Sequence, residues 1–224
     1  EAMTTLKCAA VLCDLDGTLI DSGHAVDAAW TRFAVEIGRD PDEILAMCHG
    51  VRTIEVMEQL NLGTPAEQTA LEVESWLIDA GSVPIPGAVD FLRSLPEEAW
   101  AVVTSSMAPT AASRFEFTEL TKPRYIVSAT DVERGKPDPA GFLLGAQLLN
   151  VSASDCVAFE DAAPGVDAGK AAGATTIGLL TTNPYDIMAH SDYVIADMSG
   201  VRVADAVRTG ETGWELTLEL DPVR

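Results

Sequence analysis

Two aspartates separated by one residue lie near the start of the chain, in the segment VLCDLDGTLIDS at residues 11–22. Asp14 and Asp16 follow an apolar run and precede Gly17, which permits a tight turn. One carboxylate can act as a nucleophile, and a second can give and take protons. Carboxylates this close repel each other, so the pair requires a positive charge from elsewhere.

Further polar residues follow later apolar runs, and they include a positive charge. These residues are Thr104 and Ser105 after WAVV, Lys136 in GKPDP, and Glu160 and Asp161 after VAF. Each has an ordinary explanation when taken alone, because such residues are frequent in turns and helix caps, and a lysine can simply be solvated. Their shared position behind predicted strands indicates one site suited to phosphate chemistry.

The elements that must position these residues alternate along the chain. Short apolar runs, each followed by turn residues and a helical pattern, lie at residues 8–13, 100–104, 124–129, 156–159, 174–180 and 192–196. This alternation predicts an α/β fold with a Rossmann-like parallel sheet covered by helices. Ligands bind beyond the carboxyl ends of the strands in such sheets, so we expect the polar residues to meet there.

The alternation of strand and helix patterns stops between residues 22 and 83, where the sequence predicts a helical insertion. We expect helices at 23–37, 41–48, 51–60 and 65–79, and a hinge in GSVPIPG at 81–87. The predicted organisation is a core of residues 1–21 and 84–224 with a helical cap domain of residues 22–83. The alternation in WELTLEL at 214–220 predicts a late edge strand.

Composition excludes several classes of protein. The 14 basic and 35 acidic residues give a net charge of −21, which repels nucleic acid and anionic membranes. No apolar run approaches the length of a membrane helix, and the first ten residues do not resemble a signal peptide, so we expect a cytoplasmic protein. The four cysteines lack metal-site spacing and are expected to be buried, reduced thiols.

Four ordered segments carry a family resemblance: DLDGTLIDS, VVTSS, GKPDP and FEDAAPGVDAGKAAG. They resemble the motifs of haloacid dehalogenase-like hydrolases, and the helical insertion resembles the C1 cap of that family. The resemblance implies that Asp14 attacks phosphorus and forms an aspartyl-phosphate. It implies that Asp16 protonates the leaving group and later activates water.

The resemblance also implies a magnesium site and a phosphate cradle. Mg²⁺ would be held by Asp14, the backbone carbonyl of Asp16 and Asp161, with Glu160 as a direct or water-mediated ligand. Lys136 would neutralise phosphate and nucleophile together. The phosphate would be bound further by the Thr104 hydroxyl and by the backbone N–H groups of Leu15 and Ser105.

Individual residues separate the branches of this family. An acid at Asp16 indicates phosphoryl transfer, because a halide leaves without a proton. The chain has no lysine between Lys7 and Lys122 that could form the Schiff base of phosphonoacetaldehyde hydrolases. A sugar-phosphate mutase similar to β-phosphoglucomutase stays as an alternative, although Val26 occupies the position of its histidine. A non-catalytic phosphate-binding protein is the alternative of another class.

The segment HGVRT at 49–53, the segment at 82–106 and the segment FEDAAPGVDAGKAAG together resemble the group that contains glycerol-phosphate and 2-deoxyglucose-6-phosphate phosphatases. This resemblance implies a small sugar or polyol phosphate as substrate, and the family resemblance with a cap of this size implies a monomer. His49 and Arg52 are hydrogen-bond donors on a cap turn that could face the substrate. Their alternative role is a surface helix cap and a salt bridge.

Overall fold

The computed structural model describes residues 3–78 and 81–223. Its helices are α1 (Gly23–Glu36), α2 (Pro41–Cys48), α3 (Thr53–Leu60), α4 (Ala66–Leu77), α5 (Ala88–Ser94), α6 (Ala108–Glu116), α7 (Ala140–Leu148), α8 (Ala163–Ala172) and α9 (Tyr185–Met188). Its strands are β1 (Thr4–Cys8), β2 (Ala10–Cys13), β3 (Ile20–Asp21), β4 (Val83–Pro84), β5 (Trp100–Val103), β6 (Ile126–Val127), β7 (Cys156–Glu160), β8 (Thr175–Leu179), β9 (Tyr193–Ile195), β10 (Val201–Thr209) and β11 (Gly213–Leu220).

The predicted parallel sheet is confirmed, and all six expected strands belong to it. Its strand order is β6-β5-β2-β7-β8-β9, with parallel pairing throughout. Every residue of β2, β5 and β7 is buried, as expected for strands covered on both faces. The chain adds β5 and β6 on one side of β2 and the later strands on the other. The carboxyl end of β2 is therefore the topological switch point, where such folds bind ligands.

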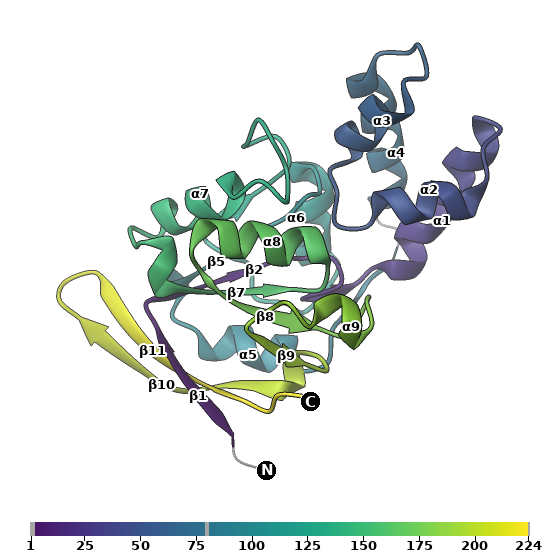
Figure 1. Ribbon diagram of the computed structural model, residues 1–224. Coiled ribbons are helices and arrows are strands. Elements are labelled where there is room, and N and C mark those ends of the chain that lie inside the picture. Colours follow the sequence, from purple (N-terminus) through teal and green to yellow (C-terminus); the bar gives the residue numbers. More distant parts are fainter. Residues whose placement is uncertain (1–2, 79–80, 224) are drawn as a thin grey trace.

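Two apolar layers enclose this sheet, because successive strand residues point to opposite faces. Ala10 and Leu12 of β2 belong to the layer that contains α7 and α8. Val11 and Cys13 belong to the layer that contains α5 and β11. Figure 1 shows this arrangement, with α7 and α8 on one side of the sheet and α5 on the other.

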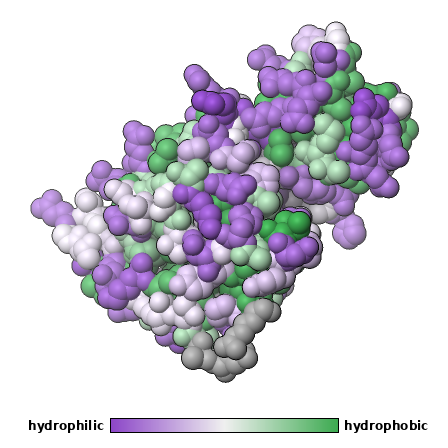
Figure 2. All heavy atoms as spheres, in the orientation of Figure 1, coloured by the Kyte–Doolittle hydropathy of each residue, from purple (hydrophilic) through white to green (hydrophobic). Residues whose placement is uncertain are grey.

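Helices α1–α4 pack around an apolar cluster of their own. Its buried members include Trp30, Phe33, Ile44, Val56 and Val73, and the rings of Trp30 and Phe33 meet edge to face at 5.8 Å. The four expected helices are present, although α3 begins at Thr53 and not at 51, and α4 spans Ala66–Leu77 and not 65–79, of which Asp79 lies outside the described residues. Figures 1 and 2 show these helices as a lobe that projects from the body containing the sheets.

Two short segments connect this lobe to the body, and they lie side by side. Strand β3 before α1 pairs antiparallel with β4 after α4, with Ile20 opposite Pro84. The Ile85 N–H donates to the Leu19 carbonyl at 2.9 Å, which extends the pairing. Both passages of the chain therefore enter and leave the lobe through one narrow connection.

One prediction about the C-terminal part is wrong. Residues 214–220 do form a strand, but β11 is the central strand of a second, antiparallel sheet with the order β1-β11-β10. The expected alternation is present, since Leu216, Leu218 and Leu220 are fully buried. They pack in the same apolar cluster as α5, and β11 is central because β1 and β10 pair with it from both sides.

The remaining expectations concern cysteines and membranes. All four cysteines are free and buried, as expected. Within residues 3–78 and 81–223, the structure has no helix with the length and apolar character needed to cross a bilayer.

Candidate active site

Four neighbouring strands of the parallel sheet deliver the polar residues to one edge. Asp14 follows β2 directly, Thr104 follows β5, and Glu160 is the last residue of β7. Lys136 lies in the loop after β6, and its ammonium reaches back to the Val103 carbonyl at 3.0 Å. Since β6, β5, β2 and β7 are adjacent, residues up to 146 positions apart in the chain become neighbours.

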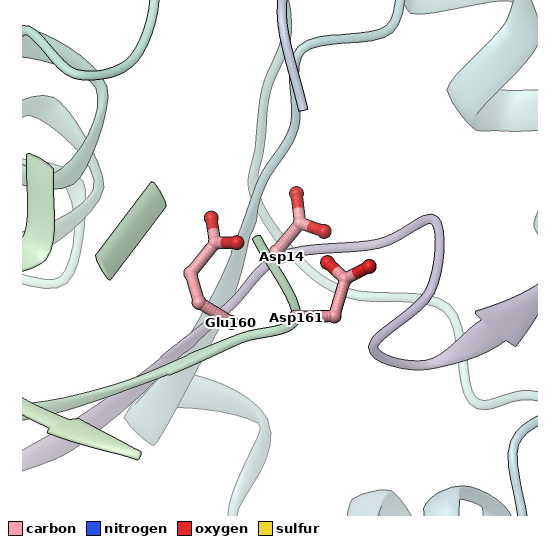
Figure 3. A group of neighbouring side chains, drawn as sticks. All are labelled: Asp14, Glu160 and Asp161. Atoms are coloured by element: carbon pink, nitrogen blue, oxygen red, sulfur yellow. The ribbon is translucent and has the colours of Figure 1, made fainter. Parts of the chain in front are cut away.

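Three carboxylates converge at this edge (Figure 3). Asp14, Glu160 and Asp161 are buried, and each offers one oxygen within 4.8 Å of the others. Two glycines leave room for them. A Cβ at Gly17 would lie 2.0 Å from an Asp161 oxygen, and a Cβ at Gly165 would lie 1.9 Å from the Glu160 carboxyl carbon. The backbone approaches these acids so closely that no larger residue fits.

Lys136 supplies the positive charge that the acids require. Its ammonium lies 2.6 Å from Asp14 Oδ1 and 2.5 Å from Glu160 Oε1. Burial disfavours the charged amine, but the two carboxylates outweigh burial and raise the pKa of Lys136 above its ordinary value. The lysine is therefore a fixed cation at the centre of the cluster.

One lysine does not balance three buried acids. Burial, with a contribution from Asp14, raises the pKa of Glu160 to about 8. Burial, followed by the charges of Asp14 and Glu160, raises the pKa of Asp161 well above its usual range. Such shifts arise where like charges share a site of low dielectric constant. An oxygen-seeking divalent cation would relieve both, so the donor set fits such an ion.

The Asp16 carboxylate is not a member of this cluster and has its own partners. It accepts hydrogen bonds from Ser22 Oγ at 2.5 Å and Ser106 Oγ at 2.9 Å. Arg114 Nε donates to the same carboxylate at 3.1 Å. Thr18 instead joins the acidic cluster, because its hydroxyl lies 3.4 Å from Asp14 Oδ2 and 3.3 Å from Asp161 Oδ1. The two aspartates of the opening segment thus occupy different surroundings.

The predicted phosphate-binding residues lie around Asp14. Thr104 and Ser105 line the same cavity as Asp14. The Thr104 hydroxyl oxygen accepts the Ser106 N–H at 3.1 Å, which fixes the turn after β5. The Leu15 side chain is fully buried, and its carbonyl accepts the Leu19 N–H at 2.9 Å in the turn after β2.

A cavity of about 930 Å³ lies between the sheet edge and helices α1–α4. Its floor includes Asp14, Asp16 and Asp161, and its opposite wall includes Trp30 and His49. The His49 ring bonds to Asp27 at 3.1 Å and to the Leu45 carbonyl at 2.9 Å. The structure therefore brings His49 to the cavity but leaves it locally paired.

The structure places Arg52 outside the residues that line that cavity. Its guanidinium donates to the carbonyls of Ala129, Val132 and Glu133 at 2.7–3.0 Å. It also pairs with Glu55 at 2.7 Å. Arg52 is buried, because it binds the loop before Lys136. The salt bridge of the alternative role is therefore present, but at a buried position at the start of α3 and not at the surface.

The sequence analysis missed two buried charged residues beside the cavity. Arg114 is 2% exposed and contacts Asp16. Glu74 is 5% exposed and accepts hydrogen bonds from Thr53 and Thr110 at 2.6 and 2.5 Å. Burial raises the pKa of Glu74. Neither lies at a strand end or in a motif, so only the packing of α4 against α6 reveals them.

Two relatives that are named phosphatases support the conclusion that this protein is an enzyme. The chain is 38% identical to hexitol phosphatase A of Escherichia coli over 83% of this chain and 92% of that protein. It is 36% identical to 2-deoxyglucose-6-phosphate phosphatase 1 of Saccharomyces cerevisiae over 90% of this chain and 92% of that protein.

A solved structure supports the fold. The β-phosphoglucomutase of Clostridium difficile matches with a TM-score of 0.71 at 23% identity, over 85% of this chain and 92% of that one. At this identity the match establishes the fold alone. Residues 8–173 match the model of one family, which includes every segment that forms the acidic cluster and its lysine. Together these findings establish that the chain belongs to the haloacid dehalogenase-like hydrolase family.

Proposed function

We propose that this protein is a Mg²⁺-dependent phosphatase that hydrolyses a small sugar or polyol phosphate through an aspartyl-phosphate. The observation that carries the proposal is the placement of Asp14. It lies at the switch point of the sheet, bonded to Lys136 and within an acidic cluster, with Asp16 outside that cluster. The two phosphatases that resemble the chain over most of its length support the same reaction.

In the first step, an oxygen of Asp14 attacks phosphorus and the bond to the ester oxygen breaks. Asp16 gives a proton to the departing alkoxide, which leaves as an alcohol. Lys136 is already bonded to Asp14 and neutralises charge that gathers on the phosphoryl oxygens. Thr104 and the N–H groups of Leu15 and Ser105 hold those oxygens.

In the second step, water attacks the phosphorus of the acyl phosphate. The Asp16 carboxylate takes a proton from that water, and the bond between phosphorus and the Asp14 oxygen breaks. Inorganic phosphate leaves, and both aspartates return to their starting states. A carboxyl outside the acidic cluster is suited to this double role, because its proton is not displaced by a metal ion.

Asp14, Asp161 and the backbone carbonyl of Asp16 would hold Mg²⁺, with Glu160 bound directly or through water. A bound ion would neutralise negative charge on the carboxylates and on the phosphate. Two observations support this donor set: the three carboxylates lie close to one another, and the pKa values of Glu160 and Asp161 are raised.

We also propose that residues 22–83 form a cap domain over a core of residues 1–21 and 84–224. The separate apolar cluster of α1–α4 and the paired β3 and β4 connection support this division. The cap would exclude water during the first step, with hinges near 21–23 and 81–87. His49 is the cap residue that we propose contacts substrate hydroxyls, since it lines the cavity.

A sugar-phosphate mutase is the second candidate, because its fold is similar. A mutase similar to β-phosphoglucomutase requires a histidine where this chain has Val26. Val26 lines the cavity, whereas the side chain of His24 is exposed and is not part of the cavity wall. These positions favour hydrolysis over isomerisation.

Hydrolysis of p-nitrophenyl phosphate with Mg²⁺ tests the proposal and its non-catalytic alternative. We expect turnover that is lost with EDTA, restored by Mg²⁺ and abolished by Asp14→Asn. Turnover that survives both EDTA and the substitution would refute the mechanism. A chain that binds phosphate without turnover would instead be a non-catalytic member of the fold.

Two further assays address the substrate. On β-glucose 1-phosphate we expect phosphate release to exceed isomer formation, and dominant isomerisation would favour the mutase. A panel of glycerol, hexose, hexitol and pentose phosphates, compared by kcat/KM, identifies the preferred class. We expect the best substrate among hexose, hexitol and glycerol phosphates.

The cysteines and the net charge bear on the cellular setting of the protein. We propose a cytoplasmic protein, because the four buried cysteines are free thiols. We propose a monomer as the active form, which light scattering at assay concentrations would test. No nucleic acid or membrane partner is expected, because the net charge of −21 repels both.

A further inference from the structure

Arg114 connects the Asp16 carboxylate to the end of the helical lobe. Its Nε donates to Asp16 Oδ1 at 3.1 Å. Its Nη1 donates to the Leu77 carbonyl at 3.2 Å and to Ser82 Oγ at 3.0 Å. Leu77 ends α4, and Ser82 precedes β4 in the connection back to the sheet body. One side chain therefore touches both the proposed acid and the moving part of the proposed cap.

Burial of the Arg114 guanidinium costs folding free energy, so stability alone does not explain an arginine at this position. The Arg114 side chain is 2% exposed, and removing a guanidinium from water requires compensation by good hydrogen bonds. Apolar residues of similar size often stabilise such buried positions equally well. Arg114 belongs to α6, whose neighbouring residues Ala111 and Phe115 already pack into the apolar core. The helix does not need an arginine at this position in order to pack.

The guanidinium shape suits a coupling role. Its planar fork can hold a carboxylate with one nitrogen and other acceptors with another, which a lysine cannot do in one fixed geometry. Ser22 also bonds to Asp16, at the start of α1. Asp16 is thereby held from both connections of the lobe, by Ser22 directly and by Ser82 through Arg114.

We propose that Arg114 is a positioning residue, which orients the Asp16 carboxyl for proton transfer according to the position of the cap. This inference rests on the proposed phosphatase reaction and adds a residue to it. A change at Leu77 or Ser82 when the cap moves would shift the guanidinium and, through it, Asp16. Arg114 itself does not reach the substrate or Asp14 in this account.

A comparison of esters with different leaving groups distinguishes a positioning role of Arg114 from a purely structural role. An alkoxide is a poor leaving group and needs a proton in the first step, and general acid catalysis supplies about 10²–10⁴-fold in rate. The p-nitrophenolate ion is stable at neutral pH and leaves without a proton. Misplacement of Asp16 should therefore slow cleavage of an alkyl ester far more than cleavage of the aryl ester.

Single-turnover measurements isolate the first step with 2-deoxyglucose 6-phosphate and p-nitrophenyl phosphate. For Arg114→Met we expect alcohol release to fall about 10²-fold and p-nitrophenolate release to fall no more than about threefold. Arg52→Met is the matched control, because Arg52 is also buried and joins the lobe to the body without touching Asp16. We expect it to slow both esters by the same factor.

Equal losses on both esters in Arg114→Met, or no loss on either, would overturn the inference. Arg114→Lys and Ser82→Ala are milder and carry the same test if Arg114→Met does not fold. Both should slow the alkyl ester selectively, by about three- to tenfold, and an unchanged ratio of the two rates would count against Arg114. The proposed function fails separately, if the parent chain cleaves neither ester.

Discussion

The two walls of the cavity are built differently. On the sheet side, Lys136 is buried with Asp14 at 2.6 Å and Glu160 at 2.5 Å, and both acids lie at the ends of neighbouring strands. On the α1–α4 side, His49 is 39% exposed on its side chain and is held by one helix and Asp27. The difference teaches that the proposed reacting groups are fixed by one another and by the sheet, whereas the residue that we propose contacts the substrate is held only by local partners.

The largest expected effect concerns the sheet wall. Lys136→Met leaves the carboxylates of Asp14 and Glu160 without their nearest cation. We expect kcat to fall by about 10²–10³-fold on every phosphate ester, because this charge acts on the phosphoryl group common to all of them. Steady-state kinetics on three different esters measures the loss.

Lys136→Arg serves as the matched control, since it keeps the charge but not the geometry. We expect it to recover only part of the activity, because the site is too closely packed for a guanidinium. If the loss of kcat in Lys136→Met varied more than about tenfold among esters, the sheet wall would also select the substrate, which contradicts the comparison of the two walls.

A second prediction concerns the lack of room for a side chain at Gly17, beside the acidic cluster. Gly17 has φ +84°, and a Cβ there would lie 2.0 Å from Asp161. We expect Gly17→Ala to lower the free energy of unfolding by about 2–4 kcal/mol and to remove most activity. Urea denaturation followed by circular dichroism measures the change.

Gly63 provides the comparison in the loop between α3 and α4. Its φ is +76°, and an added Cβ would meet nothing within 4 Å. Gly63→Ala should therefore cost only the backbone strain, about 1 kcal/mol, and leave kcat unchanged. Equal costs at both positions would mean that the acidic cluster is not as tightly enclosed as described.

A third prediction uses pH. The pKa of Glu160 is about 8 in the folded chain and near 4.5 when unfolded, so the folded state binds an extra proton between these values. This contribution to stability is fully present below about pH 4.5 and is lost as pH rises through 8. We expect the Tm of the metal-free protein to fall from pH 5 to pH 8, as calorimetry can measure.

Mg²⁺ should raise Tm more at pH 8 than at pH 5, because deprotonated carboxylates bind it better. Glu160→Gln should flatten the decline in the metal-free protein. If Tm of the parent rose over this range, or if Glu160→Gln left the slope unchanged, burial of the cluster would not control it.

The smallest expected effect concerns the opposite wall. His49→Ala should raise KM for a hexose or hexitol phosphate by about three- to tenfold, with kcat within about twofold, because it removes a contact made before and during reaction. Inhibition by inorganic phosphate should not change. The readout is the KM and kcat pair for each ester.

His190→Ala is its control, because His190 also pairs with an aspartate at 3.1 Å and has a similar side-chain exposure of 37%. His190 does not line the cavity and should have no kinetic effect. A drop of more than about tenfold in kcat for His49→Ala would move that residue into the reacting machinery and break the comparison.

The strand ends were predictable from sequence because each signal is local. An apolar run followed by Asp14, Thr104 or Glu160 marks a strand and its carboxyl end, and parallel topology then brings the ends together. The four helices of the lobe were predictable for a similar reason, since their apolar residues recur at helical spacing and each run ends at a turn signal.

Other features depend on contacts that no local pattern encodes. Arg114 carries no signal in the sequence, and the partners of Arg52 cannot be read from its motif, yet both are buried by residues far along the chain. Strand β11 is central because β1 and β10 pair with it from both sides, and its own alternation does not show how many partners it has. Side-chain direction and strand order are set by packing, which the sequence displays only indirectly.

The most direct test of the central claim is detection of the phosphoryl group on Asp14. The protein is mixed with p-nitrophenyl phosphate and Mg²⁺, quenched in acid within milliseconds, digested and analysed by mass spectrometry. We expect the peptide that contains Asp14 to carry one phosphoryl group, and Asp16→Asn to increase that fraction because its second step lacks a base. Phosphate release without any phosphorylated Asp14, or with the phosphoryl group on another residue, would contradict the account.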